Sequence, residues 1–213
     1  WQRRDGQPLT PLVSWQDRRS EAFCRHLRLA GTPPRITGLT GLAVDPMFPA
    51  GKLTGMLAAL PDGLSRAQAG ELCIGTVDCW LSWQLSAGET FVTDHANAAR
   101  TQLYNLHSGD WDDELLALFH IPRAALPQTV PSASAQGVVA VNDIPGLKVG
   151  TPILSRIGDS HAALQAQRSG SSEVVKATYG TGSSLMMSMA TPLLTENGLS
   201  TTVAWHDGSL RFA

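Results

Sequence analysis

Residues 153–161, ILSRIGDSH, carry the change from strand to helix that indicates an α/β fold. Branched apolar residues lead into Gly158 and Asp159, and a helical pattern begins directly after them. In α/β sheets, ligands bind at the carboxyl ends of strands, which is where Asp159 would lie. A carboxylate at that place can accept a proton from a bound hydroxyl or hold a metal ion. The alternative from these residues alone is that Asp159 is only the N-cap of the helix.

A second turn follows in residues 178–184, TYGTGSS. Gly180 and Gly182 would let backbone N–H groups approach an anion closely, and the hydroxyl of Thr181 adds a donor without charge. A hairpin turn also needs glycine for its positive φ, so a purely structural role stays open. Together the two turns would offer a carboxylate that activates a hydroxyl and a cradle for phosphate, which is what phosphoryl transfer to an alcohol requires.

Strand-like and helix-like patterns alternate along the rest of the chain. Apolar spacing and cap residues predict helices over 17–30, 51–60, 76–85, 93–103, 110–120 and 160–168. Alternation and turn residues predict strands over 9–15, 137–141, 149–157, 173–178, 183–190, 199–205 and 209–212. In the helix over 76–85, the residues expected to face the core are Val77, Trp80, Leu81 and Leu85. Residues 127–136, rich in Pro, Ser and Ala, are expected to be a connector.

The composition excludes several classes of protein. The 213 residues are 43% hydrophobic and 16% charged, which is enough apolar material for a sizeable core. Sixteen Lys and Arg against eighteen Asp and Glu give a net charge of −2, so the chain has no basic field for a nucleic-acid backbone. Its apolar runs are too short to cross a bilayer. We therefore expect neither a nucleic-acid nor a membrane partner.

Three cysteines, Cys24, Cys73 and Cys79, are not spaced as Cys-x-x-Cys. An odd number without that spacing argues against a disulfide framework or a zinc ribbon and for a reducing compartment, the cytoplasm. We expect all three to be small packing residues. His95 and His161 have no second ligand three or four residues away, so no protein metal site is predicted from them.

Residues 15–19, WQDRR, are a candidate sugar contact. The face of Trp15 could stack on the C–H face of a sugar, and the polar side chains after it could bond to sugar hydroxyls. The alternative is a buried tryptophan followed by an aspartate that starts a helix.

With these residues the chain resembles the FGGY family of carbohydrate kinases, and within it the glycerol kinases. The segments that carry the resemblance are 15–19 (WQDRR), 41–46 (GLAVDP) with Lys52-Leu53, 75–81 (GTVDCWL), 93–101 (TDHANAART), 109–112 (GDWD), Ile121-Pro122, Gly158-Asp159 and 178–182 (TYGTG). They occur in the family's order and run almost end to end.

The resemblance implies an α/β, ribonuclease H-like fold of the actin-type ATPases, in which two such domains enclose the active site. By position, residues 1–190 resemble an incomplete N-terminal, sugar-binding domain. Residues 191–213 resemble the truncated beginning of the C-terminal, nucleotide-binding domain. A piece of this extent is expected to lack turnover by itself.

The resemblance also implies roles for individual residues. Asp159 resembles the catalytic base that takes the proton of the attacking hydroxyl. Gly180, Thr181 and Gly182 resemble the loop that contacts nucleotide phosphates, with ATP and Mg²⁺ as the implied cofactors. The implied substrate contacts are Trp15, His95, Asp159 and Ser160. The implied partners are a small polyol or sugar and ATP, and a homo-oligomer is compatible with the family.

Two positions depart from the glycerol kinase pattern, and both lie on the substrate side. His95 stands where glycerol kinases have Tyr, and Ser160-His161 stand where they have Gln-Gln. These departures favour a longer polyol or a ketose over glycerol and leave the phosphoryl-transfer residues unchanged. Two alternatives stay open: a non-catalytic sugar- or nucleotide-binding relative of the same fold, and a glycerol kinase proper.

Overall fold

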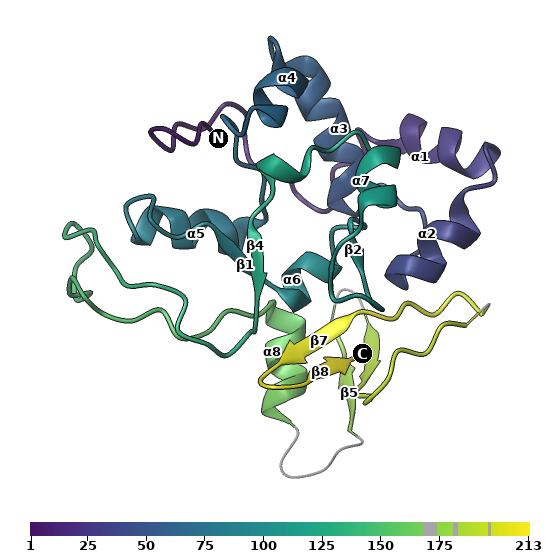
Figure 1. Cartoon of the computed structure of the whole chain (residues 1–213). Coiled ribbons are helices and arrows are strands. Elements are labelled where there is room, and N and C mark those ends of the chain that lie inside the picture. Colours follow the sequence, from purple (N-terminus) through teal and green to yellow (C-terminus); the bar gives the residue numbers. More distant parts are fainter. Residues whose placement is uncertain (168–173, 181–182, 196) are drawn as a thin grey trace.

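A computed structural model describes residues 1–167, 174–180, 183–195 and 197–213 (Figure 1). The α-helices in these ranges are α1 (Glu21–Leu29), α2 (Pro33–Thr40), α3 (Pro49–Ala59), α4 (Gly63–Gln68), α5 (Val77–Leu85), α6 (His95–Ala99), α7 (Asp113–Leu118) and α8 (Asp159–Ala166), and η1 (Arg123–Ala125) is a 3₁₀ turn. None of these helices has the length and apolar character that crossing a bilayer requires.

Strands within the described ranges pair two by two. The parallel pair is β1 (Val92–Asp94) with β4 (Gln128–Val130). The antiparallel pairs are β2 (Tyr104–Asn105) with β3 (Asp110–Trp111), β5 (Val175–Thr178) with β6 (Ser184–Met187), and β7 (Val203–His206) with β8 (Leu210–Phe212). Parallel neighbours need a long crossover, and here the crossover contains α6 and α7. This crossover begins with α6, which follows the carboxyl end of β1 without an intervening residue.

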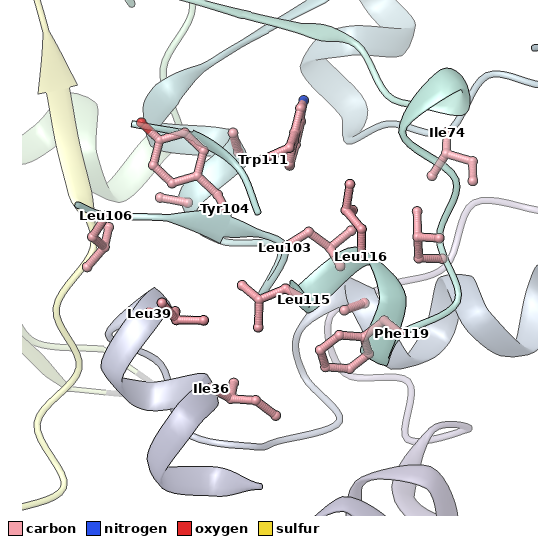
Figure 2. Packing of buried hydrophobic residues seen from close by; sticks show 14 of the residues in the cluster. Ile36, Leu39, Ile74, Leu103, Tyr104, Leu106, Trp111, Leu115, Leu116 and Phe119 are labelled. Atoms are coloured by element: carbon pink, nitrogen blue, oxygen red, sulfur yellow. The ribbon is translucent and has the colours of Figure 1, made fainter. Parts of the chain in front are cut away.

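Buried hydrophobic side chains form a core cluster, part of which lies between α2, α7 and the β2–β3 hairpin (Figure 2). Leu115, Leu116 and Phe119 come from α7 or its end and are at most 5% exposed. Ile36 and Leu39 face them from α2. Each buried side chain of this size contributes about 1.5–3 kcal/mol to the free energy of folding. This cluster therefore fixes the hairpin that supplies Tyr104 and Trp111, which enter the site below.

Several predicted elements are confirmed. The helices over 17–30, 51–60 and 160–168 correspond to α1, α3 and α8, although α1 begins at Glu21, later than predicted. The two C-terminal hairpins form as β5–β6 and β7–β8. Asp94 caps α6, because its Oδ1 accepts the backbone N–H of Asn97 at 2.9 Å. The predictions over 93–103 and 110–120 give only the short helices α6 and α7.

The predicted strand over residues 9–15 is wrong, because these residues form no strand. Proline lacks the N–H that a ladder needs, and Pro8 and Pro11 flank and interrupt the segment. Leu12 is 73% exposed and has no sheet to face. The strands over 137–141 and 149–157 are likewise reduced to isolated bridges, such as Val138 with Pro152. The connector at 127–136 instead contains β4.

The buried face of α5 also differs from the prediction. Val77 and Leu81 are 50% and 52% exposed, while Cys79, Ser82 and Trp83 are buried. Trp83 and Trp80 both pack edge-on against Trp1, with ring centroids 6.1 and 5.0 Å from it. Apolar periodicity alone gives the wrong face here, because α5 is apolar nearly all round.

The three cysteines are free thiols with at most 2% exposure. Burial raises the pKa of each of them, of Cys79 most clearly. The prediction that Cys24, Cys73 and Cys79 are packing residues is therefore confirmed.

Candidate functional site

Asp159 is exposed and is the first residue of α8. Gly158 occupies the N-cap position, so the alternative that Asp159 is only the cap is wrong. Oδ1 of Asp159 accepts the adjacent backbone N–H of Ser160 at 2.6 Å. Within the described ranges its other oxygen has no hydrogen-bond partner. The structure thus leaves this carboxylate available to a ligand.

A pocket of about 810 Å³ includes both Asp159 and Trp15 in its lining. The polar side chains around it include Lys52, Asp78, Asn97 and Arg100, and much of the remaining lining is apolar. Two of the predicted site residues, distant in sequence, are therefore brought to one pocket. His95, Ser160 and Gly180 are not part of this lining. Thr181 and Gly182 lie outside the described residues.

Trp15 is 65% exposed, so the alternative that it is a buried packing residue is wrong. The side chain of Lys52 holds the backbone at Trp15 in place. This side chain is only 4% exposed, and its Nζ donates to the carbonyls of Ser14, Trp15 and Met47 at 2.8, 3.1 and 3.2 Å. Burial lowers the pKa of Lys52, while the three carbonyls use all three donors of the ammonium group. Lys52 therefore fixes the loop that presents Trp15.

Lys52→Met should destabilise the protein, because three carbonyls would lose their donor. Hydrogen bonds to a charged group are worth about 1.5–3 kcal/mol, so the midpoint of urea unfolding should fall, and acrylamide should quench tryptophan emission more readily. Lys148→Met, at an exposed position, is the matched control. Equal unfolding midpoints for the two variants would contradict this role of Lys52.

His95 begins α6 and is half-buried. Its Nδ1 lies 2.8 Å from the hydroxyl of Tyr104. The imidazole ring of His95 also packs edge-on against the ring of His206, with the ring centroids 4.7 Å apart. Burial first, and then the charge of His206, lowers the pKa of His95 to about 4. The imidazole is therefore neutral at physiological pH.

Further round α6, Asn97 and Arg100 approach the Asp159 turn. A Cβ atom placed on Gly158 would lie 3.7 Å from Nδ1 of His161 and 3.9 Å from Oδ1 of Asn97. His161 is 7% exposed, and burial, with a smaller effect from Arg100, lowers its pKa to about 4. The turn that carries Asp159 thus lies against Asn97 of α6, and the charge of Arg100 acts on His161 in the same turn.

Sequence reasoning missed the polar groups beneath β1. Asp78 accepts hydrogen bonds from the hydroxyls of Thr76 and Thr93 at 2.5 and 2.8 Å, and burial raises its pKa. Arg156 is 7% exposed and donates to the carbonyl of Val92, while its Nε and one terminal nitrogen have no partner in the described structure. A charged residue within the apolar run before Asp159 was the available signal for Arg156.

No cluster of three or more His, Cys, Asp or Glu side chains suited to a metal occurs among the described residues. Mg²⁺ that enters with a nucleotide needs less, because it usually takes one or two carboxylates together with phosphates and water. Among the described residues, Asp159 offers the pocket one carboxylate oxygen without a hydrogen-bond partner. The donors present therefore fit an ion of this kind.

This chain belongs to the FGGY family of carbohydrate kinases, because residues 1–165 match the family's N-terminal domain. It is 58% identical over 213 residues to the apulose kinase of Pectobacterium atrosepticum, which covers 100% of this chain and 43% of that protein. It is 46% identical over 205 residues to the glycerol kinase of Paracidovorax citrulli, covering 96% of this chain and 40% of that protein. The chain thus spans less than half the length of these relatives.

Solved structures agree with this assignment. The glycerol kinase of Plasmodium falciparum, solved with ADP, superposes with a TM-score of 0.91 at 26% identity, over 100% of this chain and 42% of that one. The xylulose kinase of Lactobacillus acidophilus gives a TM-score of 0.83 at 20% identity, over 97% and 41% of the chains, and speaks for the fold alone. The predicted family and the actin-type α/β fold are confirmed.

Proposed function

We propose that the protein containing this chain transfers the γ-phosphoryl group of ATP to a hydroxyl of a small sugar or polyol. The observation that carries the proposal is the exposed carboxylate of Asp159, which shares one pocket with Trp15 and has one oxygen without a hydrogen-bond partner among the described residues. Membership of a carbohydrate kinase family supports it. Because the chain spans less than half the length of these relatives, the proposed turnover is that of the whole protein.

In the proposed reaction Asp159 orients the acceptor hydroxyl and takes its proton late in transfer. The substrate oxygen forms a bond to the γ-phosphorus, the bond to the β–γ bridging oxygen breaks, and ADP leaves. The transition state is loose, so positioning and charge stabilisation account for most of the rate. Gly180, Thr181 and Gly182 are the proposed contacts to the nucleotide phosphates. Mg²⁺ bound with ATP would neutralise charge on those phosphates.

We propose that Trp15, His95 and Ser160 contact the acceptor and that the acceptor is a ketose or a longer polyol. A neutral histidine offers one donor and one acceptor at fixed positions, unlike the tyrosine that stands there in glycerol kinases. The relative named apulose kinase is more similar to this chain than the glycerol kinase named with it. Apulose is therefore the first sugar to test.

The test of the proposed function is ADP release by the whole protein over a panel of ketoses and polyols. Release that depends on the acceptor supports a kinase. Sugar or nucleotide binding without such release would instead identify the non-catalytic alternative.

His95→Tyr separates the proposed acceptor from glycerol. If the site is built for another sugar, we expect the KM for glycerol to fall and that for the preferred sugar to rise, each by about three- to tenfold, the effect of one hydrogen bond. Steady-state kinetics of both acceptors with saturating ATP measure this. A glycerol kinase proper would show little change in its use of glycerol.

The division into residues 1–190 and 191–213, the cytoplasmic location and a homo-oligomer stay predictions.

A further inference from the structure

The hydroxyl of Tyr104 has a single hydrogen-bond partner among the described residues, Nδ1 of His95. Tyr104 is 0% exposed, so water does not reach this side chain. Its ring packs edge-on against Trp111, with centroids 6.3 Å apart. Tyr104 itself lies in the core cluster at the β2–β3 hairpin (Figure 2). Its hydroxyl is therefore held at a fixed place beside His95.

We propose that Tyr104 is a positioning residue that keeps His95 in the tautomer with its hydrogen on Nε2. His95 then donates a hydrogen bond to an acceptor oxygen of the sugar. This inference rests on the proposed function for its ligand, but the assignment of the tautomer does not.

The tautomer follows from the balance of donors and acceptors. If Nδ1 of His95 carried the hydrogen, the Tyr104 oxygen would accept it, and the phenolic hydrogen would be buried without a partner. An unpaired buried donor costs about 1–3 kcal/mol. The phenol therefore donates to Nδ1, and in a neutral imidazole the hydrogen is then on Nε2. Burial favours both neutral forms, because it lowers the pKa of His95 and raises the pKa of Tyr104.

Two contacts leave Nε2 as the nitrogen available to a ligand. Tyr104 occupies Nδ1, and the ring of His206 packs edge-on against the imidazole. Nε2 has no hydrogen-bond partner in the part of the chain that is described. A fixed N–H donor favours an oxygen that can only accept, such as a ketose carbonyl or a ring oxygen. A hydroxyl can reorient to suit either tautomer.

The tautomer can be measured without any catalytic activity. In the whole protein labelled with ¹⁵N-histidine, two-bond ¹H–¹⁵N correlations should show His95 with its hydrogen on Nε2. Tyr104→Phe should move His95 toward the other tautomer, while the exposed His26, His107 and His120 stay unchanged. Hydrogen on Nδ1 of His95 in the wild type, or the same His95 pattern in both proteins, would overturn the inference.

Kinetics then test the effect on the ligand. Dihydroxyacetone and glycerol differ only in a carbonyl against a secondary alcohol. Tyr104→Phe should raise the KM for dihydroxyacetone about three- to tenfold, with kcat nearly unchanged and a smaller effect on glycerol. In a His95→Gln background, Tyr104→Phe should change neither KM further. An equal rise for both acceptors, or the same rise without His95, would mean that Tyr104 acts only through general packing. No acceptor-dependent turnover in the wild type would count against the proposed function and leave the tautomer result standing.

Discussion

Asp159→Asn should lower kcat of the whole protein by about 10²–10⁴-fold, the usual contribution of a general base. The amide keeps the size of the side chain but cannot take the proton of the acceptor hydroxyl. Since Oδ1 only accepts the N–H of Ser160, the exchange leaves the start of α8 in place. A coupled ADP-release assay measures the loss.

Two controls separate this loss from a binding defect. Sugar affinity, measured by calorimetry, should stay within a few-fold of the wild type. Asp143→Asn makes the same chemical change at an exposed loop position and should leave turnover intact. If Asp159→Asn turns over at the wild-type rate, Asp159 is not the base.

Stability should fall by about 3 kcal/mol between pH 6.5 and pH 4 because of His161 alone. The pKa of His161 is lowered from 6.5 to about 4 in the folded protein, and each pKa unit is worth about 1.4 kcal/mol. In this window the unfolded chain binds the proton and the folded chain does not, so acid favours unfolding. The contribution is fully present above pH 6.5 and is lost as the pH falls toward 4.

The environment of His161 explains this shift. Its side chain is buried, and Arg100 and Lys176 both disfavour a positive charge on it, against a weaker opposite effect of Asp159. His95 changes stability in the same direction.

His161→Gln should flatten the pH dependence, because glutamine does not titrate. Glutamine is also the residue that glycerol kinases have at the position corresponding to His161. The free energy of unfolding, taken from urea titrations at pH 7.5, 6.0, 5.0 and 4.5, measures the difference between the variant and the wild type. His26→Gln, at an exposed position, should follow the wild type. Parallel curves for His161→Gln and the wild type would show that His161 is not held neutral by the fold.

Local signals in the sequence predicted local structure well. The strands predicted over 199–205 and 209–212 correspond to the β7–β8 hairpin, and the helix predicted over 93–103 contains α6. The strand predicted over residues 9–15 does not form, because Pro8 and Pro11 lack the N–H that a ladder needs. The prediction of the buried face of α5 is wrong because tertiary contacts with Trp1 determine which residues are buried, and periodicity does not.

The family and the position of Asp159 in a pocket with Trp15 were accessible from motifs. Motifs do not predict which groups hold the site residues in position. Lys52 beneath Trp15, Tyr104 beside His95 and Arg156 beside β1 each depend on contacts between residues distant in the chain. No spacing rule encodes such contacts, since they arise only when the core brings the segments together.

The most direct test of the proposed phosphoryl transfer is the identity of the product. The whole protein should be incubated with ATP, Mg²⁺ and the best acceptor of the panel and followed by ³¹P NMR. A sugar phosphate monoester that appears in equal amount to ADP is the result expected here. Inorganic phosphate in place of the ester, or no loss of ATP, would contradict it.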